Sequence, residues 1–505
     1  MDHTEFVVGR CAYRTVVIAP GTENLNQTTF DLLKTYIDNG GKVLVYCRPD
    51  RLDGRVNPAV SALFDPARPN IIDADINVSA IENPHLQSEN FQISDLAGGY
   101  VLHQRRQMEL GQLLFLTNAS LADTATGTVI YKGCGAAAMD LFTGTVVDYP
   151  HTVEADAITI TFTLAPAGSL LLYISELPLS SIKPSKPLKA DKPIHSEAPI
   201  TCSRVSDNVL VLNYCDLTLN GLTTRNQYVL DAAAQAFKAH GFASGNPWRT
   251  IQFKRNIVEK DNFGPDTGFK AAYTFVVEGN VEFNNIKAVV EKPYIWTVTI
   301  NGHKVKPDSG QTWLDRSFGV YTIGRFVTRG RNTLCLSVCP MSVHAEIEPV
   351  YILGDFCVTP TDTRWIITQP RSLHPGSWRE QGLPFYSDAV MYSKEFYIAC
   401  LAESYAVGLK HWRGTMAEVL VNGVSAGVIA YQPYQIDVSG LIRPGTNCID
   451  IKVVGSLCNT IGPFFVDTEG IAGPNKWETV PDTPRPKHYH FTDYGLFDEV
   501  YLLQS

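Results

Sequence analysis

Two distant stretches of the chain repeat the same order of strand and turn residues, and this repeat constrains the fold more than any other feature. The first copy joins Trp296-Thr-Val-Thr-Ile-Asn-Gly-His303 to Arg329-Gly-Arg-Asn-Thr-Leu-Cys-Leu-Ser-Val338. The second joins Ala417-Glu-Val-Leu-Val-Asn-Gly-Val424 to Pro444-Gly-Thr-Asn-Cys-Ile-Asp-Ile-Lys-Val453. Asn-Gly favours a two-residue type I′ hairpin turn, because both central residues need a positive φ. The repeat predicts two jelly-roll β-sandwiches, over residues 201–350 and 351–505.

A helix is expected to interrupt the first of these sandwiches. Val229, Leu230, Ala233 and Phe237 share one face at helical spacing, and Gly241 ends the pattern.

The part of the chain before the repeat has a second β-rich region. Apolar residues alternate in runs such as Ala157-Ile-Thr-Ile-Thr-Phe-Thr-Leu164 and Ser169-Leu-Leu-Leu-Tyr-Ile174, with Gly, Asn, Asp and Pro between the runs. This pattern predicts a small antiparallel sandwich over residues 86–177. Residues 178–200 are rich in Pro, Lys and Ser and are interpreted as an extended linker.

The first 85 residues carry the only mixed helix and strand pattern. Two apolar runs, Arg14–Pro20 and Lys42–Cys47, flank a stretch with helical spacing. Thr28 or Thr29 is the expected N-cap of this helix. Pro58 fits the first turn of a second helix. We interpret residues 1–85 as a partial, flavodoxin-like α/β unit. A complete doubly wound sheet needs more strands, so we expect the rest of this unit upstream of Met1. The chain is therefore expected to be mostly β.

Composition and charge narrow the range of partners. The formal charge of −9 is spread thinly, without the clusters of Lys and Arg that nucleic acids require. No apolar run reaches the ~20 residues that span a bilayer, and no signal peptide is visible, so we expect no membrane partner and, by default, a cytoplasmic protein. His488-x-His490 lacks a third nearby ligand, and no glycine-rich phosphate loop is present. No metal and no cofactor are expected.

Several segments resemble a known family. The paired Asn-Gly sandwiches look like the sugar-binding domains of family 2 glycoside hydrolases, and this likeness implies jelly rolls of the galactose-binding-like kind. The order of Glu346-Ile-Glu-Pro-Val-Tyr-Ile-Leu-Gly-Asp-Phe356, Leu373-His-Pro-Gly-Ser-Trp-Arg-Glu-Gln-Gly-Leu-Pro-Phe-Tyr-Ser387 and Asp493-Tyr-Gly-Leu-Phe-Asp-Glu-Val-Tyr501 is more specific. It is similar to the rear half of the large α-L-rhamnosidase class, glycoside hydrolase family 106.

The resemblance implies a non-catalytic function for this chain. In that family a (β/α)₈ barrel precedes such domains and carries the catalytic glutamates. A barrel needs ~200–250 residues of alternating strand and helix, and in this chain only the first 85 residues have such a pattern. No catalytic residue therefore carries over, and whether the chain is an enzyme stays open. We expect an accessory region that binds an oligosaccharide or plant-type glycan and supports an upstream catalytic barrel. Two alternatives remain: an active glycoside hydrolase that uses loop carboxylates, and a structural interaction module without glycan affinity.

Aromatic residues in a glycine-rich loop are the first candidates for glycan contact. Sugars present flat C–H faces and many hydroxyls, which aromatic rings and amide groups recognise. The loop candidates are Trp378, Gln381, Phe385 and Tyr386, and a second candidate pair is Trp412 and Arg413. The competing interpretation is that Trp378 and Tyr386 pack under the loop and pin the two sandwiches together. Glu346, Glu348 and Asp355 are interpreted as structural residues.

Overall fold

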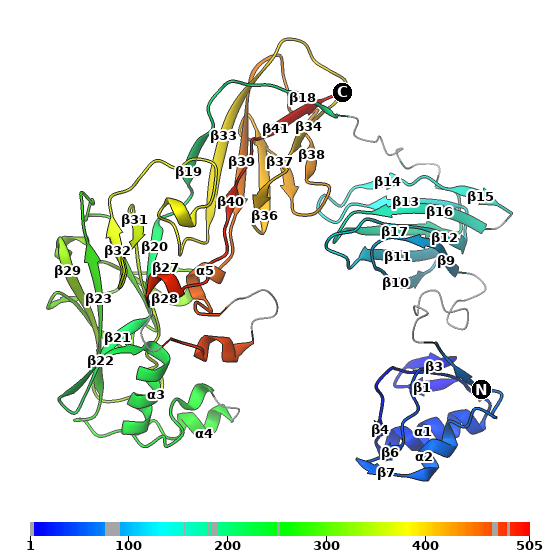
Figure 1. Ribbon diagram of the computed structural model, residues 1–505, viewed down its shortest axis with the longest axis horizontal. Coiled ribbons are helices and arrows are strands. Elements are labelled where there is room, and N and C mark those ends of the chain that lie inside the picture. Colours follow the sequence, from blue (N-terminus) through cyan, green and yellow to red (C-terminus); the bar gives the residue numbers. More distant parts are fainter. Residues whose placement is uncertain are drawn as a thin grey trace. The chain divides into compact units, whose positions relative to one another are not determined.

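β-Strands dominate the regular structure of this protein, as Figure 1 shows for the computed structural model, so the expected mostly β fold is confirmed. The structure describes residues 5–75, 91–155, 157–179, 182, 190–249, 253–466, 473–481 and 485–505. They form two compact units that divide between residues 187 and 188, with residues 431–433 grouped with the first unit.

The N-terminal part of the first unit is a small α/β arrangement. Its parallel sheet has the order β3 (Thr15–Ile18), β5 (Lys42–Val45) and β8 (Ile71–Asp73). Helix α1 (Gln27–Asp38) buries Phe30, Leu33, Tyr36 and Ile37, and α2 (Pro58–Leu63) begins at Pro58 as expected. Short pairs complete it: β1 (Phe6–Val8) with β2 (Cys11–Tyr13), and β6 (Arg51–Leu52) with β4 (Asn24–Leu25) and β7 (Arg55–Val56).

The predicted N-cap of α1 is wrong. The side chain of Asn26, not of Thr28 or Thr29, accepts a 2.8 Å hydrogen bond from the backbone amide of Thr29. The helix starts earlier than the apolar pattern indicated, because its first turn is polar and exposed.

The second part of the first unit is an antiparallel sandwich over the described residues 91–175. Residues of both of its sheets, among them Leu114, Phe162 and Leu172, share one core. One sheet contains, in order, β10 (Val101–Met108), β11 (Gly111–Asn118), β17 (Ser169–Ser175), β13 (Gly135–Met139) and β14 (Val146–Asp148). The other contains β15 (Thr152–Glu154), β16 (Ala157–Leu164), β12 (Ala125–Lys132) and β9 (Phe91–Ala97).

The second unit has two β-rich cores, the first of which includes the expected helix. Helix α3 (Val229–Ala239) buries Val229, Ala233 and Phe237 against this core. One sheet contains β20 (Asn208–Leu212), β30 (Val350–Gly354), β24 (Lys287–Glu291), β28 (Asp315–Thr322) and β27 (Thr312–Trp313). The other contains β22 (Leu222–Tyr228), β21 (Tyr214–Leu219), β23 (Phe269–Val277), β29 (Gly330–Val338), β25 (Thr297–Ile300) and β26 (His303–Val305), together with β31 (Cys357–Pro360) and β32 (Trp365–Thr368).

The second core of this unit lies between two further sheets. One contains β19 (Thr201–Arg204), β33 (Ala389–Ile398), β39 (Gly445–Val454), β36 (Met416–Val421) and β37 (Val424–Ile429), and the other contains β18 (Lys192–Ile194), β41 (Tyr501–Gln504), β34 (Tyr405–Gly408) and β38 (Gln435–Asp437). Strands β35 (Trp412–Arg413) and β40 (Gly495–Leu496) form a separate pair. Short helices α4 (Lys254–Val258) and α5 (Cys458–Ile461) lie in the connections.

The strands of the second unit do not divide at residue 350. Strand β32 joins the first group through Ile367, which pairs with Val277 of β23, whereas β18 and β19 pair with strands of the second group. One of these strands, β18 at Lys192–Ile194, lies inside the segment that was expected to be a linker. Residues 180, 181 and 183–189 of that segment lie outside the described residues. Alternating apolar residues in a sequence predict strands, but they do not predict which strands pair with one another.

Both copies of the repeat form the hairpins that the Asn-Gly pairs predicted. Asn301 and Gly302 have φ values of 48° and 84°, and Asn422 and Gly423 have values of 51° and 80°. These left-handed residues connect β25 to β26 and β36 to β37.

Candidate functional site

The aromatic loop expected to contact a glycan is buried inside the second unit. Trp378, Gln381, Phe385 and Tyr386 are only 2%, 8%, 0% and 1% exposed. Phe385 belongs to the first core, whereas Trp378 and Tyr386 belong to the second. The loop therefore inserts side chains into both cores, as the packing interpretation of Trp378 and Tyr386 expected, and these four side chains leave almost no surface for a ligand.

The polar groups of this loop are also occupied within the protein. Gln381 donates from Nε2 to the carbonyls of His374 and Ser377 at 3.0 and 3.1 Å, and its Oε1 accepts from the amide of His374 at 2.9 Å. Trp378 donates from Nε1 to the Tyr392 hydroxyl at 2.7 Å. Such satisfied groups hold the loop in one conformation.

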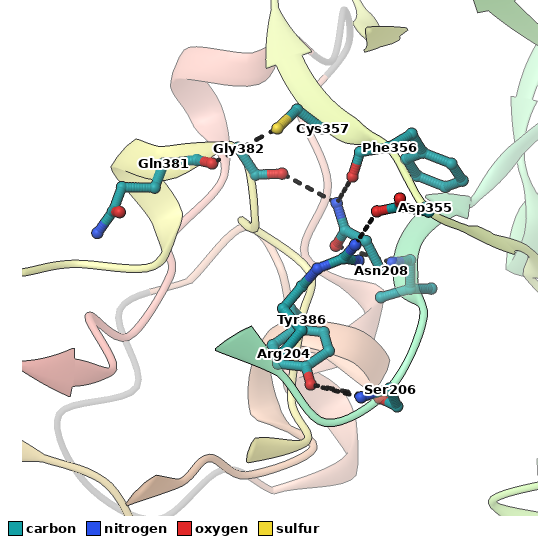
Figure 2. A network of polar contacts seen from close by, with 10 residues as sticks. Arg204, Ser206, Asn208, Asp355, Phe356, Cys357, Gln381, Gly382 and Tyr386 are labelled. Carbon is teal, nitrogen blue, oxygen red and sulfur yellow. Dashed lines mark hydrogen bonds and ion pairs between the residues drawn. The ribbon is translucent and has the colours of Figure 1, made fainter. Parts of the chain in front are cut away.

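A network of polar contacts links the same loop to the first core (Figure 2). The buried amide of Asn208 donates to the carbonyls of Phe356 and Gly382 at 2.8 and 3.0 Å. The Tyr386 hydroxyl accepts from the backbone amide of Ser206 at 3.2 Å. The loop and this network form a joint between the two cores, which we call the inter-core joint.

Two of the acidic residues interpreted as structural make polar contacts within the second unit, and Asp355 does so beside this joint. Asp355 pairs with Arg204, and Glu346 accepts from Lys292 Nζ at 2.7 Å and from Asn246 Nδ2 at 3.0 Å.

Trp412 and Arg413 are more accessible than the loop residues. Trp412 is partly buried against Tyr434, with ring centroids 5.5 Å apart, and Arg413 is exposed. The Trp412 indole nitrogen has no partner among the described residues. This pair keeps its status as a predicted glycan contact.

The best candidate site is a cavity that the sequence interpretation did not include. Its volume is about 250 Å³, and it opens to solvent in the first part of the second unit. Its lining comes from β20, β21, β22, β23, β29 and β32 and from the segment around Arg485–Tyr489. We call it the arginine cavity, because Arg331, Arg364 and Arg485 line it.

Three lining side chains have a buried polar atom without a hydrogen-bond partner among the described residues. These atoms are Asn213 Nδ2, the Tyr214 hydroxyl and Trp365 Nε1. Asn213 is only 3% exposed, and its Oδ1 accepts from the Tyr489 hydroxyl at 2.9 Å. Burial raises the pKa of Tyr214 well above its ordinary value, so its hydroxyl keeps the proton and can donate. Buried polar groups without partners are uncommon, and their grouping at one cavity is typical of a binding site.

One residue of the predicted aromatic loop packs against the lining of this cavity. The ring of Trp365 packs edge-on against Phe385, with centroids 5.4 Å apart, and against Tyr489 at 5.8 Å. Phe385 thus positions a wall of the cavity without lining it.

A smaller cavity of about 160 Å³ lies beside α3 in the same unit. Glu291 and Glu348 line it together with Tyr228, Phe318, Tyr351 and Trp477. Burial, and then the nearby Glu291 carboxylate, raise the pKa of Glu348 to about 8, and burial also raises the pKa of Glu291. We call it the carboxyl cavity.

In the part of the chain that the structure describes, no group of three His, Cys, Asp or Glu side chains is placed to hold a metal ion. None of the described helices is both long and apolar enough to cross a bilayer.

Comparisons with known proteins give distant matches among solved structures. No family model matches the chain, and no curated protein does. A rhamnosidase from Novosphingobium sp. PP1Y shares 13% identity at a TM-score of 0.41, covering 100% of this chain and 35% of that one. An α-L-rhamnosidase from Streptomyces avermitilis, solved with L-rhamnose, shares 12% identity at a TM-score of 0.22, covering 72% of this chain and 36% of its own. The chain spans about a third of the length of these two proteins, and the likeness is too low to assign a family.

Proposed function

We propose that the chain is a carbohydrate-binding and scaffolding region of an α-L-rhamnosidase-like glycoside hydrolase, and that the arginine cavity is its glycan site. One observation carries the binding part: Asn213, Tyr214 and Trp365 line the same open cavity, and each has a buried polar atom without a hydrogen-bond partner among the described residues. The family part rests on the resemblance of the segments at Glu346–Phe356, Leu373–Ser387 and Asp493–Tyr501.

The chemistry of the cavity suits a saccharide. An indole and two phenol rings provide apolar surface for the C–H faces of a pyranose, while the nearby amide and guanidinium groups can bind its oxygens. Because the wall residue Trp365 is fixed by Phe385 and Tyr489, little conformational freedom is lost when a ligand binds.

The scaffolding part rests on the inter-core joint. A loop that inserts Phe385 into one core and Trp378 into the other couples the two parts of the second unit. Rigid coupling of this kind keeps a binding cavity in a fixed position relative to the neighbouring core.

Titration of the full chain with plant oligosaccharides tests the proposal. Isothermal titration calorimetry with rutinose, a neutral rhamnosyl disaccharide, and with pectic oligosaccharides should show saturable binding to at least one of them. Trp365→Phe removes the indole donor and should weaken that binding, whereas Trp313→Phe, outside the cavity, should leave it unchanged. Loss of binding only in Trp412→Ala would move the site to the second predicted pair. Absence of binding to every oligosaccharide would favour the purely structural module.

The carboxyl cavity favours the hydrolase as a second candidate function. Glycosidases use two carboxyl groups, one of which stays protonated near neutral pH, and Glu348 and Glu291 share one cavity. Turnover of 4-nitrophenyl α-L-rhamnoside by the purified chain, lost in Glu348→Gln and retained in Glu282→Gln, would establish this activity. No turnover would leave the non-catalytic function as the better account.

A further inference from the structure

The partnerless polar groups of the arginine cavity are all able to donate. Asn213 Nδ2 and Trp365 Nε1 are donors only, and the protonated Tyr214 hydroxyl can donate as well. The acceptor of the Asn213 amide is already used by Tyr489. A ligand that pairs with these three buried atoms must therefore bring acceptor oxygens.

The positive charge of the cavity also favours a ligand with acceptor oxygens. Among the described lining residues, Arg331, Arg364 and Arg485 contribute three guanidinium groups and Asp216 contributes one carboxylate, in a chain whose formal net charge is −9. Asp216 already accepts from the backbone amide of Asn226 at 2.8 Å. Among the described residues, none of the three arginines forms an ion pair with a carboxylate.

One contact positions an arginine without using up its charge. Arg331 donates from Nη2 to the Thr274 hydroxyl at 3.3 Å, and both residues line the cavity. A neutral hydroxyl partner holds the guanidinium group in place and leaves its charge uncompensated.

We propose that the arginine cavity binds an acidic saccharide, with a uronate carboxylate at the rim arginines and sugar oxygens at Asn213, Tyr214 and Trp365. This inference rests on the proposed function and names the ligand class of the same site. A planar guanidinium matches a carboxylate with two parallel hydrogen bonds, and charge-assisted bonds are stronger than those to a neutral hydroxyl. The carboxyl cavity, whose described lining includes two acidic residues and no arginine, would disfavour the same ligand.

A matched pair of ligands tests the inference on the full chain. α-1,4-Trigalacturonate and its fully methyl-esterified form have the same sugar rings and differ in charge, so calorimetry with both isolates the carboxylate. The acid should bind about tenfold tighter than the ester at low salt, and this advantage should shrink as the NaCl concentration rises. Arg364→Gln and Arg485→Gln should reduce acid binding toward that of the ester. Arg329→Gln, an exposed change outside the cavity, should have no effect.

The outcomes separate this inference from the proposed function. Equal affinity for acid and ester would overturn the acidic ligand and leave glycan binding intact. Binding of neither sugar would overturn the acidic ligand, and the proposed function would fall with it if rutinose did not bind either. Binding of tetraglutamate as tightly as trigalacturonate would also overturn the inference, because the cavity would then select charge and not a sugar.

Discussion

Asn422 donates from Nδ2 to Asn447 Oδ1 at 3.0 Å, and the amide of Cys448 returns a 3.0 Å hydrogen bond to Asn422 Oδ1. The first copy of the repeat contains the same pair, since Asn301 donates to Asn332 at 2.8 Å and accepts from the amide of Thr333 at 2.9 Å. Each Asn-Gly turn is thus tied to the Gly-x-Asn turn that follows it along the chain. The repeated residues encode a hydrogen-bonded lock as well as a hairpin.

Loss of one lock should destabilise the second unit. Asn447 is fully buried and also donates to the carbonyls of Arg443 and Gly445. Asn447→Ala leaves these groups without partners and should lower the free energy of unfolding by ~1–3 kcal/mol in urea denaturation. Asn332→Ala should cost a similar amount. The exposed Asn262→Ala serves as the control, and an equal loss there would contradict the role of the lock.

The inter-core joint should not accept a side chain at Gly382. This glycine has a φ of +86°, and a Cβ atom would lie 2.6 Å from Cys357 Cβ and 2.8 Å from its Sγ. Gly382→Ala combines left-handed strain with a steric clash, so we expect a loss of at least ~2 kcal/mol in urea denaturation. Gly440→Ala adds its Cβ in open space and should change stability by less than ~0.5 kcal/mol. Similar results for both variants would mean that the joint is not tightly packed.

Stability should depend on pH through Glu348. Its folded-state pKa of about 8 lies above the usual value of 4.5. The folded protein therefore retains a proton that the unfolded chain releases, and this residue's contribution to stability is complete below pH ~4.5 and is lost as the pH rises toward 8. Glu348→Gln should be more stable than wild type at pH 8.5 and should unfold with a weaker pH dependence between pH 5 and 8. The test is denaturation at several pH values, with Glu282→Gln as the exposed control. A wild-type slope in Glu348→Gln would contradict the buried protonated carboxyl.

Trp378 should affect stability and not glycan affinity. Trp378→Phe removes the hydrogen bond to the Tyr392 hydroxyl and should lower the free energy of unfolding by ~1 kcal/mol. Its affinity for any oligosaccharide that the chain binds should stay within about twofold of wild type, because the side chain is 2% exposed. A selective loss of affinity with unchanged stability would restore the original prediction for this loop.

Local patterns predicted the fold well and the candidate site poorly, for physical reasons that particular residues show. Alternation and Asn-Gly turns depend on neighbouring residues, so the strand at Ala157–Leu164 and the turn at Asn301-Gly302 could be predicted. The same aromatic and glycine composition serves a glycan-binding loop and a loop that plugs two cores, so the sequence of Trp378–Tyr386 could not distinguish these roles. The arginine cavity joins Asn213 to Tyr489 across 276 positions, and only the adjacent Arg364-Trp365 pair could have drawn attention to it.

Strand β41 pairs on one side with β18, where Lys192 lies opposite Gln504 and Ile194 opposite Leu502. This antiparallel register places the entry and the exit of the second unit at the same end of one ladder. A force applied between residue 190 and residue 505 would act at that end of the pair, so its hydrogen bonds would break one after another. The unit should therefore begin to yield at low tension from its ends inward, and joining these neighbouring ends with a short linker should permit a circular permutant whose new termini lie elsewhere on its surface.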